Sequence, residues 1–528
     1  MTRLRSVRLS GRRPLMGLGL IAVLALTACT GTGETNSHSN SSQASNQSVV
    51  YSHSGALASL DPVHADFSET ASVDQALYDT LISYDQKNEI VPELARSYKV
   101  AADVLSISVT LRSGVIFHDG SRVTAKDVAY TLNRDVKLAV GVASTLSDYA
   151  STHVVDPTHL VIHLKRPSTL FLGALSNIYI VESRLVSAHQ GTDDGQAWLN
   201  KNDAGSGPYT LSSVSTTQVI TKRYPKYWAF NSHRPAKFMF LESDQASTTA
   251  ASIKAGNVSI GKIDTTSAAT LKGQRGITLK KLRDGAQVYI YFNTSQGPTS
   301  NIAVRKAVRL AYDYNAGLEK IRQGLGIIAT GPLPSSVSCR PPEPPSKQNL
   351  AEAKKVLKDA GISNLTLTLG YQPNSAKNAQ EATLLQSDLK GIGVDLKLTP
   401  MQFPAYLQSL SSFSTIPEMF LAADAPPYPG AGTMLSTLYL STAVGSNRTG
   451  FSDPTFDSLV NRALKTSDEK TQCQLYEQAQ LILAKEMPAA DLYESADIWA
   501  YDSNLGNSVQ VNPVHGTLDV KAVEFAKK

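Results

Sequence analysis

Alternation of apolar and polar residues marks the strands of this chain. In VLSISVTLR, residues 104–112, every second residue from position 105 is Leu, Ile or Val, and the residues between them are Ser or Thr. Because successive side chains of a strand point to opposite faces, this spacing predicts a half-buried strand. HLVIHLKRP at 159–167 repeats the pattern, and the aromatic run VYIYFNT at 288–294 predicts a third strand.

Helix start signals lie between these strands. Asn349 precedes LAEAKKVLKDA and can cap its first turn, and a glycine follows the last residue, which predicts a helix over 349–361. Thr124 with Asp127 has the spacing of a capping box. Asp453 is followed by proline, which is favoured at the first position of a helix.

Two longer segments also carry a helical pattern. Residues 301–324 predict one amphipathic helical segment that stops near a glycine, and residues 466 to about 487 predict a long helix that stops at Pro488. Strands and helices alternate along the chain, so the predicted class is α/β.

Length and charge narrow the class of protein further. The chain has 528 residues, which is too long for one hydrophobic core and predicts two or more domains. The net charge of +5 lies entirely in the first 28 residues, which hold five arginines, and the remaining 45 basic residues equal the 45 acidic ones. A balanced body carries no electrostatic signal for nucleic acid, so no nucleic-acid partner is expected.

The N-terminus has the composition of an export signal. The arginines are followed by LMGLGLIAVLAL at 15–26, which has the length of a signal-peptide core and is too short to span a bilayer. The next residues, LTAC, resemble the lipobox of bacterial lipoproteins, in which the cysteine is acylated; the alternative is an ordinary signal followed by a coincidental cysteine. We therefore expect a signal peptide at 1–28, lipidation of Cys29, and a flexible Ser/Asn-rich tether at 29–48.

Two further cysteines, Cys339 and Cys473, leave two alternatives open. An oxidising compartment permits a disulfide between them. Cys473 lies on a helical pattern, where a buried free thiol is equally consistent with the sequence.

Motifs of catalysis are absent from the sequence. It contains no G-x-S-x-G, H-E-x-x-H, Walker or G-x-G-x-x-G motif. No enzyme activity, cofactor or metal site is therefore predicted.

One apolar stretch keeps a single carboxylate. FLAADAPPYPGAG at 420–432 has Asp424 as its only charge, and no further charged residue follows until Arg448. A buried carboxylate without a partner is costly. Asp424 is therefore expected either to reach solvent or backbone donors within a turn, or to be completed by a cation from a ligand.

Eight blocks of the chain carry a resemblance to a known family. They are LDP (60–62), ALYDTLISYDQKNEIVPELARSY (76–98), LRSGVIFHDGSRVTAKDVAYTL (111–132), GSGPYTL (205–211), YPKYW (224–228), FNTSQGPTSNIAVRKAVRLAYD (292–313), AKKVLKDAG (353–361) and LILAKEMPAADLY (481–493). In family order, these blocks resemble the extracytoplasmic solute-binding proteins of peptide-type ABC importers, which include oligopeptide-, dipeptide- and nickel-binding members.

The resemblance implies a two-lobed α/β fold of the periplasmic-binding-protein type (type II, large peptide-binding cluster), with a hinge and a ligand cleft between the lobes. Lobe I would comprise 49–285, with an inserted subdomain at about 79–205, and lobe II 286–489. The segment 490–528 would return to lobe I.

The same resemblance implies the ligand residues. In peptide-binding members, an aspartate at the position of Asp424 binds the α-ammonium of the peptide. Phe67 and Ser68 would run alongside the ligand, and Tyr289 and Tyr291 would line the cleft unless both are core aromatics. Dipeptide-type members hold the ligand carboxylate with an Arg just before the helix that corresponds to 382–393 here. The aligned position is Ala379, and Lys377, two residues earlier, is the nearest candidate.

The implied function is capture of peptides outside the cytoplasm, by a monomeric protein held to the cell membrane through its lipid. The bound peptide would pass to an ABC permease and its ATPase subunits. Two alternatives remain: the same fold binding an oligosaccharide, an opine-like compound or a metal chelate, and a sensory lipoprotein without transport.

Overall fold

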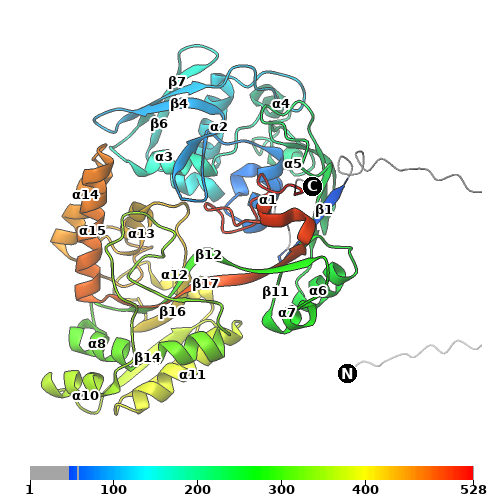
Figure 1. Cartoon of the computed structure of the whole chain (residues 1–528). Coiled ribbons are helices and arrows are strands. Elements are labelled where there is room, and N and C mark those ends of the chain that lie inside the picture. Colours follow the sequence, from blue (N-terminus) through cyan, green and yellow to red (C-terminus); the bar gives the residue numbers. More distant parts are fainter. Residues whose placement is uncertain (1–46, 56, 58, 527–528) are drawn as a thin grey trace, which may run out of the picture. The chain divides into compact units, whose positions relative to one another are not determined.

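A computed structural model describes residues 47–55, 57 and 59–526. The predicted signal peptide, Cys29 and most of the predicted tether lie outside the described residues. No helix within the described ranges has the length and apolarity that crossing a membrane requires. Strands and helices alternate along the chain (Figure 1), which confirms the α/β class.

The largest element is an eleven-stranded mixed sheet. Its strands follow the order β15-β14-β16-β12-β17-β11-β1-β10-β9-β8, and β13 pairs with β17. We call β1 and β8–β11 the first part of the sheet, and β13–β16 the second part. The bounds are β1 (Ser48–His53), β8 (Tyr209–Val214), β9 (Gln218–Arg223), β10 (Lys237–Glu242), β11 (Ile260–Ile263), β12 (Ile277–Phe292), β13 (Gly326–Ile328), β14 (Thr366–Tyr371), β15 (Asp395–Pro400), β16 (Met419–Asp424) and β17 (Ala489–Asp502).

Two long strands belong to both parts of this sheet. β12 has 16 residues and β17 has 14, and they pair antiparallel along most of their length. β17 also pairs with β11 of the first part, and β12 with β16 of the second (Figure 1). Their pairing is interrupted between Arg283 and Gln287, where Gly285 has a φ of +81°. Such an irregularity bends a strand and is favoured by a glycine in the left-handed region.

Two small sheets complete the strands. β2 (Ile82–Tyr84) pairs with β3 (Ile90–Pro92), and a four-stranded sheet has the order β4-β5-β7-β6. The four strands are β4 (Ala95–Val100), β5 (Ser106–Leu111), β6 (Tyr149–Val154) and β7 (His159–Leu164). The strands predicted within 104–112 and 159–167 are thus confirmed, and β5 buries Ile107, Val109 and Leu111 as the alternation requires.

The helices begin where the sequence supplies caps. The side chain of Asn349 accepts the N–H of Glu352 at 3.0 Å, Asp453 accepts that of Phe456 at 2.8 Å, and Thr124 starts a helix with a complete capping box. The bounds are α1 (Ser68–Leu77), α2 (Ala125–Leu138), α3 (Leu170–Ala174), α4 (Ser183–Ala188), α5 (Gln196–Leu199), α6 (Ala246–Lys254), α7 (Thr265–Leu271), α8 (Ile302–Ala311), α9 (Tyr314–Ala316), α10 (Leu350–Asp359), α11 (Ala376–Lys390), α12 (Phe403–Ser409), α13 (Ala431–Leu438), α14 (Pro454–Leu464) and α15 (Glu469–Glu486).

Two predicted helix bounds are wrong. The segment predicted at 301–324 breaks after α8, because Tyr312 is extended and the Asp313 side chain accepts the N–H of Ala316, which starts a new turn. A π-helical turn, η6 (Gly317–Ile321), follows. α15 begins three residues later than predicted, because Asp468 caps it by accepting the N–H of Thr471.

Helices cover both faces of the second part of the sheet. Side chains of α12–α15 form one core with Tyr289 and Tyr291, and side chains of α8, α10 and α11 form another with Val288 and Ile290. Alternate residues of β12 therefore point into two separate cores, as the period of a strand dictates.

A disulfide joins the two remaining cysteines. Cys339 and Cys473 are bonded, with their Cα atoms 4.9 Å apart. Of the two alternatives that the sequence left open, the structure therefore shows the disulfide. The bond fixes the proline-rich loop between β13 and α10 to α15.

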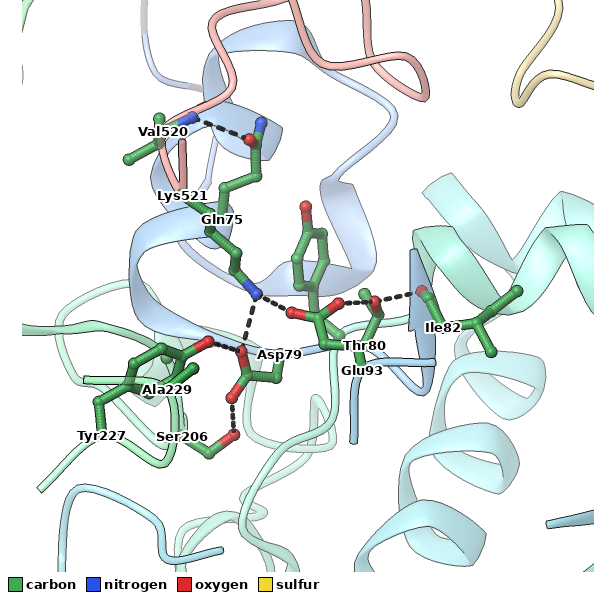
Figure 2. A network of polar contacts seen from close by, with 12 residues as sticks. Gln75, Asp79, Thr80, Ile82, Glu93, Ser206, Tyr227, Ala229, Val520 and Lys521 are labelled. Atoms are coloured by element: carbon green, nitrogen blue, oxygen red, sulfur yellow. Dashed lines mark hydrogen bonds and ion pairs between the residues drawn. The ribbon is translucent and has the colours of Figure 1, made fainter. Parts of the chain in front are cut away.

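The C-terminal segment is held to the region around α1 by a buried polar network (Figure 2). Lys521 Nζ donates to Asp79 at 2.8 Å and also contacts Glu93, while Asp79 accepts from Ser206 at 2.9 Å and from Tyr227 at 3.0 Å. Burial opposes the charge of Asp79, but Lys521 and the hydroxyl donors outweigh it and lower the pKa of Asp79. At Glu93 burial prevails over Lys521 and raises the pKa to about 7.

Candidate ligand-binding site

Asp424 is the last residue of β16 and pairs with Gln287 of β12. The strand does not continue, because the prolines at 426 and 427 have no N–H to donate to a neighbouring strand. Ala423 and Ala425 on either side of it are exposed. The strand therefore ends at an accessible position, although the Asp424 side chain itself is mostly buried.

The carboxylate already has two partners within the protein. Tyr291 donates its hydroxyl to Oδ2 at 2.8 Å, and Arg448 donates Nη2–H to Oδ1 at 2.9 Å. The side chains of Asp424 and Arg448 are 16% and 11% exposed. The expectation of a lone carboxylate, satisfied only by its own turn, by solvent or by a ligand, is therefore wrong. A carboxylate can accept about four hydrogen bonds, so Asp424 keeps capacity for a further donor.

Arg448 is the partner that the sequence analysis did not assign. It is the next charged residue after Asp424, and the chain returns it through α13 and a turn in which its N–H donates to the carbonyl of Leu438 at 3.1 Å. Burial disfavours the guanidinium charge, but the Asp424 carboxylate outweighs this effect and raises the pKa of Arg448. The pair therefore carries no net charge.

Tyr289 and Tyr291 are core aromatics in this structure. They are 0% and 1% exposed, and their rings stack with centroids 5.0 Å apart. Tyr289 donates its hydroxyl to the carbonyl of Pro332 at 3.0 Å. Neither ring faces open space, and only the hydroxyl of Tyr291 reaches the predicted ligand residue Asp424.

Two other predicted ligand residues meet at one cavity. Ser68, the first residue of α1, and Lys377, in the first turn of α11, both line a cavity of about 440 Å³. This volume lies in the range of small-molecule sites, about 300–1,000 Å³. Phe67 does not line the cavity, but it precedes Ser68 and is 48% exposed. Residues some 300 positions apart therefore converge, as a cleft between two lobes would require.

Charges of both signs line this cavity. Lys262 of β11 and Asp497 of β17 form an ion pair at 2.8 Å, and Glu69 and Lys377 also line the cavity. Among the described residues, Lys377 has no ion-pair partner. Burial lowers the pKa of His53, also in the lining, and Glu69 only partly offsets this effect. The cavity can therefore accept a solute that carries both an ammonium and a carboxylate.

Lys262, Asp497 and Glu69 were not predicted from the sequence. Lys262 and Asp497 are 235 positions apart, and only the pairing of β11 with β17 brings them together. The sequence indicated Glu69 only weakly, because this residue directly follows Phe67 and Ser68, which were predicted to contact the ligand.

A second cavity of about 440 Å³ lies beside the irregularity in β12. Arg283 donates to Ser335 at 2.6 Å and to Glu494 at 3.3 Å in its wall. None of the predicted ligand residues lines it. As for metals, no group of three or more His, Cys, Asp or Glu side chains that could hold an ion occurs in the described part of the chain.

Comparisons with known proteins agree with this architecture. The model of the family "Bacterial extracellular solute-binding proteins, family 5 Middle" matches residues 89–446. The glutathione-binding protein GsiB of Salmonella typhimurium is 27% identical over 472 residues, covering 87% of this chain and 91% of GsiB.

Solved structures share the fold. HbpA2 from Haemophilus parasuis superposes with a TM-score of 0.81 at 21% identity, covering 91% of this chain and 100% of HbpA2. The binding protein DppA from Helicobacter pylori, in complex with the peptide STSA, gives a TM-score of 0.73 at 21% identity, covering 92% of this chain and 98% of DppA.

The two-lobed fold of the peptide-binding cluster is thus shown for this chain. Proteins of this family bind solutes for ABC importers and are not enzymes. From the family match over more than half of its length and from the shared fold, we conclude that this chain belongs to the bacterial extracellular solute-binding proteins of family 5.

Proposed function

We propose that this protein captures peptides outside the cytoplasm and presents them to an ABC permease with its ATPase subunits. The lobes would be 49–285, with the inserted subdomain at about 79–205, and 286–489, with 490–528 returning to lobe I. Ligand would close the two lobes by contacting both, since a ligand shifts such a balance only through its greater affinity for the closed form.

The observation that carries this proposal is the cavity shared by Ser68 and Lys377. Ser68 lies in the proposed lobe I and Lys377 in the proposed lobe II, so one solute can contact both. Lys377 would receive the carboxylate of the peptide in this cavity. Asp424 does not line the cavity, so a peptide whose α-ammonium it received would have to extend beyond the cavity lining. The charges of both signs that line the cavity suit a zwitterion better than a neutral sugar.

Glutathione is one peptide that deserves a direct test, because the relative from Salmonella typhimurium is named for it. The alternative of a metal chelate finds no support in side chains, since the described residues offer no cluster of metal ligands. Opine-like compounds carry both charges as well and are the closest non-peptide competitors.

Native mass spectrometry of the freshly purified protein, followed by release of the bound solute, tests the proposal. A released peptide is the expected result, and a released saccharide would overturn it. Lys377→Gln should weaken binding of tri-alanine by about two- to fivefold, the size of an exposed ion pair. Lys358→Gln, on exposed α10 surface, is the matched control and should leave affinity unchanged.

The lipid anchor is part of the same proposal. Cys29 would hold the protein to the cell membrane, since the acyl chains contribute roughly 0.8 kcal/mol per buried CH₂. Cys29→Ser should move the protein from the membrane fraction to the medium or periplasm. Unchanged partition between the fractions would remove the anchor from the account.

A further inference from the structure

The guanidinium of Arg448 has donors to spare. A guanidinium carries five N–H groups. Among the described residues, only the carboxylate of Asp424 accepts one of them, and Nε is buried without any hydrogen-bond partner. Its remaining contact is a cation–π interaction with Tyr406, whose ring centre lies 5.7 Å from Cζ. Buried donors are normally satisfied, so an acceptor is missing at this position.

Asp424, next to Arg448, has unused capacity to accept hydrogen bonds. Each of its two oxygens accepts one hydrogen bond, from Tyr291 and from Arg448, and a carboxylate can accept about two at each oxygen. Both side chains retain some exposure, 16% for Asp424 and 11% for Arg448. An acceptor with spare capacity and a donor with spare capacity are therefore 2.9 Å apart at an accessible strand end.

The surroundings hold this pair in place. Tyr406 stacks on Phe420 with centroids 3.6 Å apart, and Tyr291 stacks on Tyr289. Arg448 lies against the first of these stacks, and the carboxylate of Asp424 is bonded to the second. Rigid aromatic walls keep the two charges at a fixed separation, which is what recognition of a fixed charge pattern needs.

An ordinary peptide does not match this pattern. Its α-ammonium is followed by a neutral amide, and its carboxylate lies at the far end of the chain. A free α-amino acid head, by contrast, carries its ammonium and carboxylate on one carbon. A γ-linked glutamyl peptide keeps such a head, and its α-linked isomer does not.

We infer that Asp424 and Arg448 together bind an amino-acid head group, with the ammonium at Asp424 and the adjacent α-carboxylate at Arg448, so that peptides with a free zwitterionic head are preferred. This inference rests on the proposed function, because it assigns the ligand's ammonium to Asp424. It adds Arg448 as a residue that determines specificity.

Calorimetric titration of the purified protein with γ-glutamylglycine, α-glutamylglycine and tri-alanine tests the inference. The two glutamyl peptides have the same composition and differ only in whether the head is zwitterionic. Hydrogen bonds to a charged group predict that the γ-linked isomer binds about 10- to 100-fold more tightly. Equal affinities of the two isomers would overturn the inference, while binding of tri-alanine would still support the proposed function. If none of the three peptides binds, the proposed function falls as well.

Variants of Arg448 separate recognition from a structural role. Arg448→Gln should abolish the preference for the γ-linked isomer, because the variant has no cation to receive the α-carboxylate. Arg448→Lys keeps the positive charge and loses the planar fork, so it should fold normally and still lose most of the preference. Arg462→Gln, on the exposed face of α14, is the control and should keep the preference. A preference that survives both changes at Arg448 would overturn the inference.

Discussion

The ion pair of Asp424 with Arg448 allows us to predict how variants change the free energy of unfolding of the protein without ligand. Asp424→Asn removes the charge but keeps an oxygen that can still accept from Tyr291 or Arg448. It therefore leaves the guanidinium in a largely buried position without its counter-charge. Breaking a fully buried pair costs about 3–5 kcal/mol, whereas an exposed pair contributes about 0–1 kcal/mol.

The exposure of the two side chains sets the expected value between these limits. With 16% and 11% of the side chains accessible, the pair lies nearer the buried limit. We expect Asp424→Asn to lower the free energy of unfolding by about 2–4 kcal/mol. Arg448→Gln should cost a similar amount, because it leaves the carboxylate uncompensated. The double variant should cost less than the sum of the two, with a coupling of about 1–3 kcal/mol.

Urea denaturation of the wild type, both single variants and the double variant measures this coupling. The cycle is read from unfolding free energies obtained at one pH near 7 and at low salt, where the pair is least screened. Additive effects, with a coupling below about 0.3 kcal/mol, would refute the reasoning that these two charges compensate each other.

Three further predictions concern stability. Lys521→Met leaves Asp79 and Glu93 without their shared cation, so it should destabilise by about 3 kcal/mol or more in urea denaturation, and a loss below about 1 kcal/mol would show that the network of Figure 2 is dispensable. Burial raises the pKa of Asp491 to about 6 in the folded protein, above its pKa of 3.8 in the unfolded chain. The protonated group therefore contributes stability that is fully present below pH 3.8 and is lost as the pH rises through about 6. Asp491→Asn should flatten this part of the plot of unfolding free energy against pH, and an unchanged plot would contradict the prediction. Replacing both cysteines of the 134-residue disulfide loop by serine should cost about 4–5 kcal/mol on a chain-entropy account, and an unchanged urea midpoint would contradict that account.

Much of the local structure could be predicted because its causes are local. Asn349, Asp453 and Thr124 each cap a helix within three residues of their own position, so the sequence contains the whole interaction. Asp313 and Asp468 act in the same way but were not recognised as caps, and this explains both misplaced helix bounds. The resemblance to a known family supplied the arrangement that local patterns do not contain.

The site could be predicted only in part, because its contacts are long-range. Asp424 was identified, but its partner Arg448 is 24 positions away and reaches it only after the chain folds back through α13. No pattern in the sequence joins Lys262 with Asp497, since the pair depends on the register of β11 against β17. The burial of Tyr289 and Tyr291 likewise depends on which helices cover that face of the sheet.

Binding of one peptide in two chemical forms tests the central claim most directly. Tri-alanine and N-acetyl-tri-alanine differ only in the charged amine that Asp424 is proposed to receive. Calorimetric titration should show that the wild type binds the free-amine form far more tightly, and that Asp424→Asn loses about 30-fold or more for this form while the acetylated form is nearly unaffected. An equal loss for both forms in the variant, or equal affinity of the wild type for both, would contradict the claim that this carboxylate receives the amino terminus of a peptide.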